Sequence, residues 1–264
     1  MKEMNKLRKL QLIELNILKE VDRICKKHHI KYYMAEGSLL GAIRHKGFIP
    51  WDDDLDIAML RDDYEKFLKV ASKEISKKYE VQHSTTIKNY WSPFIKIRYL
   101  DNKEYAQSHI AHLTKNNGPL LDIFPIDNVP KKNSIRQFIQ AFKIRLYRGM
   151  LGLKLYRKPH SIKSYVVWIL SKFYSIEKLH LKLDKTFKKY NNPSNNYIVN
   201  LASYYNYKKQ TFPKEYYGNP KYVKFEDMLA PVPSCADKIL TKIYGDYMKI
   251  PPKEKRVTKH HFNN

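Results

Sequence analysis

The chain has 264 residues, with 50 lysines and arginines against 26 aspartates and glutamates, which gives a formal net charge of +24. Hydrophobic residues make up 43% of the chain and aromatic residues 13%, a composition that excludes a disordered or low-complexity protein. The strong positive charge predicts contact with a polyanion, such as nucleic acid, an acidic membrane or an anionic glycopolymer.

Cysteine usage and the N-terminal residues bear on the cellular compartment. Cys25 and Cys235 are the two cysteines and form no CxxC pair, so neither a disulfide framework nor a zinc knuckle is indicated. Charged residues interrupt the N-terminal stretch throughout, unlike a signal peptide, and no segment reaches the roughly 20 apolar residues that span a bilayer. We therefore expect a cytoplasmic protein, with peripheral contact to the inner membrane face as a further expectation.

The first half of the chain alternates between predicted helices and strands. Apolar residues at helical spacing, or in short alternating runs, predict helices over 4–29 and 39–44 and strands over 30–35, 51–59, 94–100 and 119–124. Asp62 is the expected N-cap of another helix. Residues 1–130 are therefore predicted to form an α/β or α+β catalytic core.

The composition changes over residues 131–190. This segment contains 16 lysines and arginines but only two acids, Glu177 and Asp184. Its apolar residues have helical spacing, which predicts a mostly helical lobe with apolar and basic faces. We expect this lobe to bind an anionic acceptor or an anionic membrane, and residues 191–264 to pack back on the core.

The most informative segment runs from Gly37 to Ile57. Four of the five residues from Asp52 to Asp56 are carboxylates, which would repel one another strongly without a cation. On a strand, Asp52, Asp54 and Asp56 would share one face and Asp53 would point the other way. Hard oxygen ligands favour Mg²⁺, or alternatively Mn²⁺, completed by substrate phosphates. Two such ions about 3.5 to 4 Å apart would clamp an in-line displacement at phosphorus.

Several other residues are candidates for binding substrate. Gly37 and Ser38 lie at a strand-to-helix turn, where backbone N–H groups and a hydroxyl can hold a phosphate. Arg44 follows and is a candidate for substrate charge. Lys96 and Arg98 alternate on a predicted strand and so face one side, where they would bind donor phosphate; alternatively, they form the solvent-facing side of an edge strand.

The segment 37–57 resembles the corresponding motif of the LicD family of phosphocholine transferases. The string from Leu121 to Asp127 and the closing Tyr244 to Met248, followed by Pro251 and Pro252, support the resemblance, which covers about residues 8–128 and 222–264. Fukutin-related ribitol-phosphate transferases are more distantly similar. The resemblance implies a nucleotidyltransferase-like core. From it, together with the composition of 131–190, we expect an α+β fold: a mixed β-sheet core with flanking helices and a basic, mostly helical insertion lobe.

The resemblance also implies a reaction and a set of site residues. The implied donor is CDP-choline or a similar CDP-linked ester, and the acceptor is a sugar hydroxyl of an anionic cell-envelope glycan or glycolipid of the teichoic acid or lipopolysaccharide type, with CMP released. Asp54, Asp56 and Asp122 match the metal ligands, and Asp52 is an added acid. Asp122 or Asp52 would position or deprotonate the acceptor. His260 resembles a family position close to the active site.

Other functions stay open at this point. The transferred group could be another CDP-linked polyol phosphate. A nucleotidyltransferase acting on nucleic acid would share the same core, but no RNA-binding motif is visible, which argues against nucleic acid as a partner. A third alternative is a non-enzymatic basic module that docks on anionic lipid or glycan.

Overall fold

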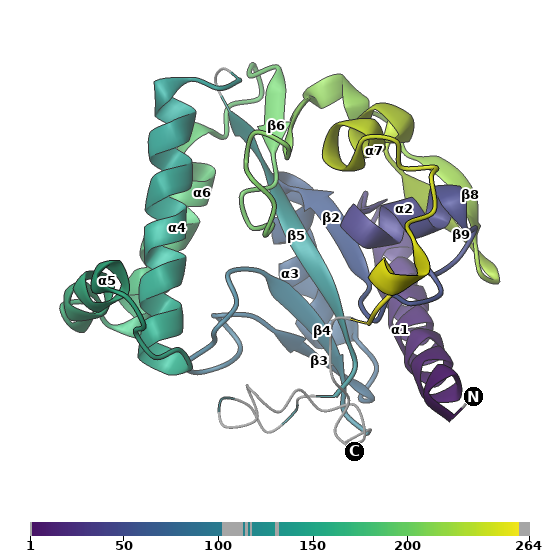
Figure 1. The fold of residues 1–264 in the computed structure, drawn as a ribbon, viewed down its shortest axis with the longest axis horizontal. Helices are drawn as coiled ribbons and strands as arrows, with labels where there is room; N and C mark the ends of the chain where they lie inside the picture. Colours follow the sequence, from purple (N-terminus) through teal and green to yellow (C-terminus); the bar gives the residue numbers. More distant parts are fainter. Residues whose placement is uncertain (1, 102–112, 114–115, 117, 130–131, 259–264) are drawn as a thin grey trace.

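The structure is a computed structural model that describes residues 2–101, 113, 116, 118–129 and 132–258. A curled mixed sheet forms its centre (Figure 1). The strands of this sheet are β1 (Tyr33–Met34), β2 (Asp56–Leu60), β3 (Tyr79–Gln82), β4 (Ile95–Tyr99), β5 (Leu120–Val129), β6 (Tyr197–Val199) and β7 (Thr211–Pro213). Their order is β1-β2-β5-β4-β3, and β6 and β7 extend the sheet from the far end of β5. Only β2 and β5 are parallel among these described strands, so the architecture is mixed α and β.

Helices pack around this sheet, and the chain adds a separate two-stranded hairpin. The helices are α1 (Lys2–Lys27), α2 (Glu36–Arg44), α3 (Arg61–Glu74), α4 (Ile135–Leu155), α5 (Ile162–Lys172), α6 (Ile176–Phe187) and α7 (Ala236–Tyr244), with short 3₁₀ turns at Lys188–Tyr190, Lys214–Tyr216 and Lys253–Lys255. The hairpin consists of β8 (Lys221–Phe225) and β9 (Met228–Val232). No helix in the described ranges is both long and apolar enough to cross a bilayer.

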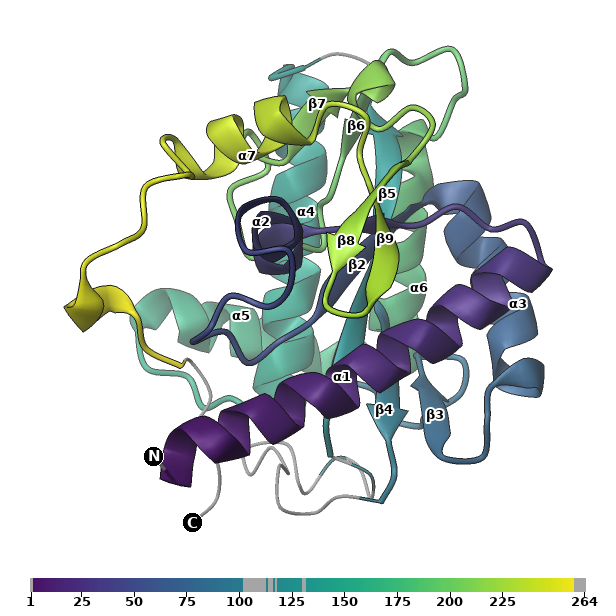
Figure 2. The same ribbon diagram turned by 90° about the vertical axis from the view of Figure 1, so that its right-hand side faces the viewer.

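The main core lies between the sheet and the two helices α1 and α3, which contact β4, β5 and β2 (Figure 2). Val21 of α1 and Phe67 of α3 are fully buried, as are Ile57 of β2 and Ile123 of β5. Cys25 is also buried in this core, as its place on the apolar side of α1 suggests. Because these apolar residues occupy one face of β2 and β5, the alternate residues of the same strands face the other side.

The strand predicted over 51–59 is wrong in its first half, because β2 begins only at Asp56. The Asp52 N–H donates to the Ile49 carbonyl at 2.9 Å, which makes a turn after Pro50. Gln11 Nε2 donates to the Asp52 and Ile49 carbonyls at 2.9 and 3.3 Å. Gln11 of α1 therefore holds the backbone at the turn, and bonding to β5 begins only at Leu55, whose carbonyl accepts from the Asp122 N–H at 2.9 Å.

The expected N-cap of α3 is also wrong. Leu60 occupies the N-cap position without a side-chain cap, and Asp62 lies in the first turn of the helix. There its carboxylate still interacts favourably with the positive end of the helix dipole. An acid stabilises the start of a helix at either position. The sequence pattern therefore placed the N-cap at Asp62, two residues after its actual position at Leu60.

A buried ion pair fixes the far end of β5. Arg61 donates to both carboxylate oxygens of Asp127 at 2.8 and 2.6 Å, and Asn191 Nδ2 donates to the same carboxylate at 2.8 Å. The N–H of Asn128 donates to Asn191 Oδ1 at 2.7 Å. Strand β5 therefore connects α3, the sheet and the residues after α6. The division of the chain at 130 and 190 into three parts stays a prediction.

Candidate functional site

A row of polar side chains crosses four neighbouring strands on the side of the sheet opposite α1 and α3. Asp56 of β2 is paired with Asp122 of β5, Asp122 with Lys96 of β4, and Lys96 with Gln82 of β3. Residues that lie opposite one another in paired strands project to the same face of the sheet. The register therefore brings together Asp56, Asp122 and Lys96, which are three of the predicted site residues.

Asp56 lies at the start of β2 and is 7% exposed. Its N–H donates to Ser38 Oγ at 2.8 Å, and its carbonyl accepts from the Ala35 N–H at 3.0 Å. Burial, and after it the negative charges of Asp54 and Glu36, raises the pKa of the Asp56 carboxyl well above its ordinary value. Ser38 thus holds the strand that presents Asp56.

The preceding loop gathers its acids differently from the predicted strand. Carboxylate oxygens of Asp52, Asp53 and Asp54 lie within 4.8 Å of one another. The expectation that Asp53 points away from the others is therefore wrong, because alternation holds only on a strand and these residues precede β2. Asp53 is also the buried member of the three.

Gly37 allows Asp52 to lie close to the first turn of α2. A Cβ atom at Gly37 would be 2.7 Å from Asp52 Oδ2, closer than side-chain packing permits. Glu36 precedes it with a φ of 47°, a left-handed conformation that is rare for a residue with a side chain. Strained backbone of this kind is concentrated at functional sites.

Glu14 of α1 is a residue of this site that the sequence interpretation missed. Its side chain is 2% exposed, and Oε2 has no hydrogen-bond partner among the described residues. Burial, and then the charges of Asp54 and Asp53, raises the pKa of Glu14 well above its ordinary value. A signal was present in the sequence, because Glu14 lies on the apolar side of the helix, between Leu10 and Ile17.

These acids form one group, which we call the acidic cluster: Glu14, Asp52, Asp53, Asp54, Asp56 and Asp122. The pKa values of Glu14 and Asp56 are raised partly by the negative charges of the other acids in the cluster, so these carboxylates repel one another. A divalent cation bound by oxygen ligands would relieve this repulsion. The donor set therefore fits Mg²⁺ or Mn²⁺.

Lys96 and Arg98 are both buried on β4, which is an interior strand of the sheet. Their alternative interpretation as the wet side of an edge strand is therefore wrong. Lys96 Nζ lies 2.6 and 2.8 Å from the two carboxylate oxygens of Asp122. Arg98 donates to Gln82 Oε1 at 3.0 Å and to the Gly118 carbonyl, and burial lowers its pKa to about 10.

Arg44 lies at the opposite end of α2 from Gly37 and Ser38. Its guanidinium donates to the Tyr247 carbonyl at 2.6 Å and to the ring of His45 at 3.0 Å. In this structure it therefore holds the segment after α7 against α2. His260 lies outside the described residues.

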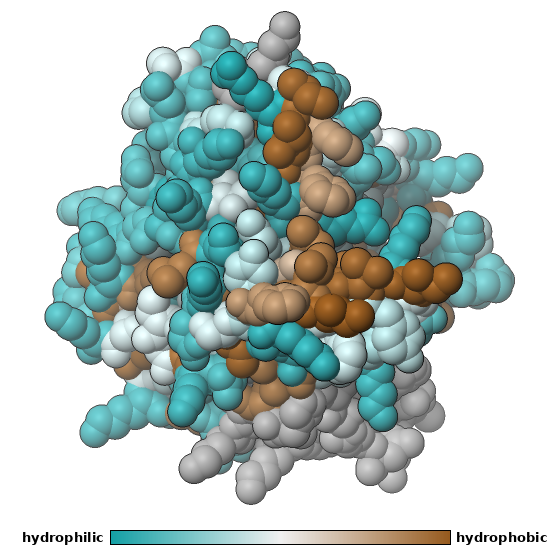
Figure 3. Space-filling model, turned by 90° about the vertical axis from the view of Figure 1, so that its left-hand side faces the viewer, coloured by the Kyte–Doolittle hydropathy of each residue, from teal (hydrophilic) through white to brown (hydrophobic). Residues whose placement is uncertain are grey.

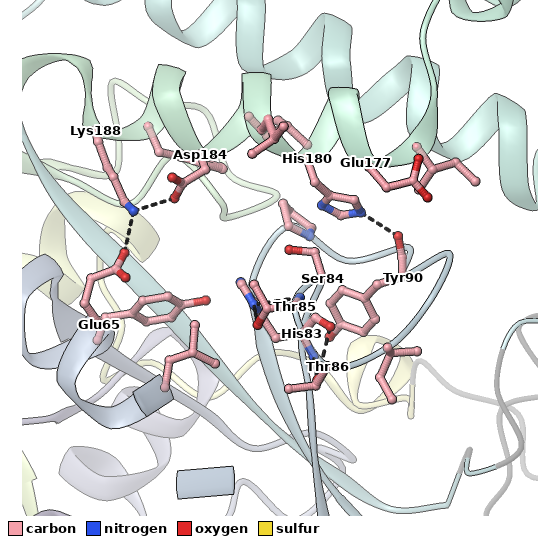
Figure 4. Close-up of a pocket in the computed structure, with 18 of the residues that line it drawn as sticks. Glu65, His83, Ser84, Thr85, Thr86, Tyr90, Glu177, His180, Asp184 and Lys188 are labelled. Carbon is pink, nitrogen blue, oxygen red and sulfur yellow. Dashed lines mark hydrogen bonds and ion pairs between the residues drawn. The ribbon is translucent and has the colours of Figure 1, made fainter. Parts of the chain in front are cut away.

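A cavity of about 520 Å³ lies between α3, α6 and the loop 83–90 (Figure 4). Tyr90 forms part of its wall, and burial and then the charge of Asp122 raise the pKa of this phenol, so Tyr90 lies within electrostatic reach of the cluster. His180 Nε2 lies 2.7 Å from the Tyr90 carbonyl. Figure 4 shows Lys188 between Glu65 and Asp184, at 2.7 and 2.8 Å.

Comparisons with known proteins agree on one family. A curated relative from Haemophilus influenzae, named lipopolysaccharide cholinephosphotransferase LicD, is 33% identical over 260 residues, covering 96% of each chain. The chain belongs to the LicD family. A family model described as LicD/FKTN/FKRP, nucleotidyltransferase domain, matches residues 29–145. Uncharacterized proteins of Rickettsia typhi and Rickettsia prowazekii are 37% and 47% identical, over 26% and 18% of this chain and 22% and 18% of their own lengths.

Most residues of the site lie inside the segment that the LicD family model matches. Residues 29–145 include Gly37, Ser38, the acids from Asp52 to Asp56, and Asp122 with Lys96. Glu14 lies on α1, before the matched segment. The LicD core of this chain therefore receives one buried carboxyl from a helix outside the matched domain.

Proposed function

We propose that this LicD chain transfers phosphocholine from CDP-choline to a sugar hydroxyl of a cell-envelope glycan precursor of the lipopolysaccharide or teichoic acid type. The observation that carries the proposal is the convergence of Asp52, Asp54, Asp56 and Asp122 from a loop and two parallel strands. The relative from Haemophilus influenzae, whose name specifies phosphocholine transfer to lipopolysaccharide, supports the choice of group and acceptor.

In the proposed reaction the acceptor oxygen attacks the phosphorus of the phosphocholine group. The new phosphate–sugar bond forms as the bond from that phosphorus to the CMP oxygen breaks, and CMP leaves. The acceptor proton passes to a carboxylate of Asp52 or Asp122. Asp54, Asp56 and Asp122 would hold a divalent cation. When bound, this cation offsets the negative charge of the donor pyrophosphate and of the departing CMP.

The surrounding residues position these carboxylates. Lys96 fixes the Asp122 carboxylate through both oxygens, and Ser38 holds the backbone of Asp56. Gln11 fixes the loop that carries Asp52. Groups held in this way need little reorganisation when the substrate binds, which favours catalysis.

The test is release of CMP from CDP-choline by the purified protein with Mg²⁺ and a glycolipid acceptor. The Asp54→Asn, Asp56→Asn double variant should lose at least about 1,000-fold in rate, because it removes two proposed ligands. Asp62→Asn is the matched control, since Asp62 is an exposed acid of α3 outside the cluster. Unchanged release by the double variant would overturn the proposed site. Release from a CDP-linked polyol but not from CDP-choline would overturn the choice of transferred group.

A further inference from the structure

The N-terminal half of α4 places its glutamines inside the protein. Gln137 is fully buried and its Nε2 donates to Thr211 Oγ1 at 2.6 Å. Gln140 is also buried and donates to the carbonyls of Thr186 and Phe187 at 2.9 and 3.1 Å. A helix on the surface of a water-soluble domain ordinarily shows the reverse arrangement. The polar side of this half-helix is therefore used for packing, and its apolar side is left outside.

The outward side of α4 and the neighbouring α5 carry one set of exposed apolar residues, which we call the apolar strip. Its members recur at three- and four-residue steps and are 42 to 86% exposed: Ile135, Phe138, Ile139 and Phe142 of α4, Ile162, Tyr165, Val166, Ile169 and Leu170 of α5, and Phe173 just after α5. Figure 3 shows hydrophobic side chains gathered on this face, in a stripe that widens near the middle of the view. Contiguous exposed patches of this kind mark interaction surfaces.

Cations accompany the apolar strip. Arg136 and Lys143 are exposed on α4, and Lys163 and Lys172 are exposed on α5. Lys172 Nζ lies 3.8 Å from the centre of the Trp168 ring, so an amphipathic tryptophan also lies beside the strip. The two acids of 131–190, Glu177 and Asp184, both lie on α6, so α4 and α5 carry no acid and the face that they form is positive. This face of α4 and α5 complements a partner that has an apolar interior and anionic groups at its surface.

We infer that the apolar strip lies on an anionic lipid bilayer, with its side chains at the boundary between headgroups and acyl chains and its cations on lipid phosphates. A second copy of the chain is a poorer partner, because docking strip to strip would bring two positive faces together. A nucleic acid would use the cations but leave the apolar side chains in water. This inference goes beyond the proposed reaction and does not depend on which group is transferred.

The experiment is flotation of the full chain with vesicles of phosphatidylcholine alone and of phosphatidylcholine mixed with phosphatidylglycerol. The strip variant is Ile162→Gln, Ile169→Gln, Phe173→Gln. The matched control is Tyr222→Gln, Leu229→Gln, Val257→Gln, which replaces three apolar side chains that are 57, 60 and 63% exposed elsewhere on the surface. Because all six are exposed, both variants should keep the circular dichroism spectrum of the unmodified protein. A second set replaces Arg136, Lys163 and Lys172 with glutamine.

We expect the unmodified protein to bind the anionic vesicles. The strip variant should bind them at least about tenfold more weakly, the cation variant should also bind more weakly, and the control should bind as the unmodified protein does. Binding that the cation variant loses but the strip variant keeps would overturn the inference in favour of simple charge attraction. Light scattering on the same samples tests whether a second copy of the chain covers the strip instead. If the unmodified protein is a dimer that does not bind vesicles, and only the strip variant is a monomer, the strip is an interface between copies and the inference is overturned. No binding by a monomeric protein would also overturn the inference.

Discussion

Lys96 and Asp122 face each other across β4 and β5, with Nζ 2.6 and 2.8 Å from the two carboxylate oxygens. The pair is at most 16% exposed at either side chain. Asp122 is thus held by a cation of the protein while it lies opposite Asp56. This arrangement makes Lys96 part of the acidic cluster's charge balance.

We predict that Lys96→Met lowers the free energy of unfolding by about 1–3 kcal/mol, because it leaves a nearly buried carboxylate without its partner. The Lys96→Met, Asp122→Asn double variant should recover part of this loss, since the unpaired charge is gone. Urea unfolding of the four proteins in a double-mutant cycle measures the coupling. Additive losses would contradict an energetic role for the pair.

A second prediction concerns Glu14. Its pKa is raised in the folded state, so the folded protein binds a proton more readily than the unfolded chain, and stability falls as the pH rises from the ordinary value of 4.5 through the folded value. Glu14→Gln keeps the shape of the neutral carboxyl and removes this loss. Without added metal, the variant should be more stable than the unmodified protein at about pH 8, and the difference should shrink towards about pH 5. Equal pH dependence of the two unfolding curves would contradict the assignment.

A third prediction concerns His83 in the wall of the cavity. Burial, and then His180, lower the pKa of His83 from 6.5 to about 4. Between these values the unfolded chain binds a proton that the folded protein does not, so stability falls as the pH is lowered through this window. His83→Gln should lose less stability over the same window, measured by thermal unfolding. His160→Gln, at an exposed position, is the control and should behave as the unmodified protein does.

The fourth prediction uses two glycines that lie within helices. A Cβ at Gly37 would meet Asp52 Oδ2 at 2.7 Å, whereas a Cβ at Gly149 of α4 would make only an ordinary contact with Val167, at 3.7 Å. Gly37→Ala should displace Asp52 and lower the proposed transferase rate by about 100-fold. Gly149→Ala should keep that rate and slightly stabilise the protein. The two rates of CMP release provide the test, and equal rates would show that the position of Asp52 is unimportant.

The sequence predicted the elements of the first half well where periodicity was strong. The helix over 4–29 is confirmed as α1, and the strand over 119–124 is confirmed as the first part of the longer β5. The strand predicted over 51–59 is confirmed only from Asp56, because Gln11, remote in sequence, holds the turn before β2. Strands β6 to β9 were missed, since strands of only three to five residues carry little periodic signal.

The candidate site was predictable in its residue types but not in its arrangement. Local pattern identified the run from Asp52 to Asp56, and resemblance identified Asp122. The partnership of Lys96 with Asp122 depends on the register of β4 against β5, which no local pattern encodes. Glu14 was readable as an acid on an apolar helix side, but its partners are set by how α1 packs against the sheet.

Strand β5 carries Asp122 near one end and Asp127, with its buried arginine, near the other. From Asp122 to Val129 the extended chain covers roughly 20 Å. Between the two acids the strand is paired in turn with β2, β4 and β6, so it is hydrogen-bonded along its length. A single strand therefore links the two acids, so that a change at the Arg61–Asp127 pair is expected to reach the acidic cluster through the backbone of β5.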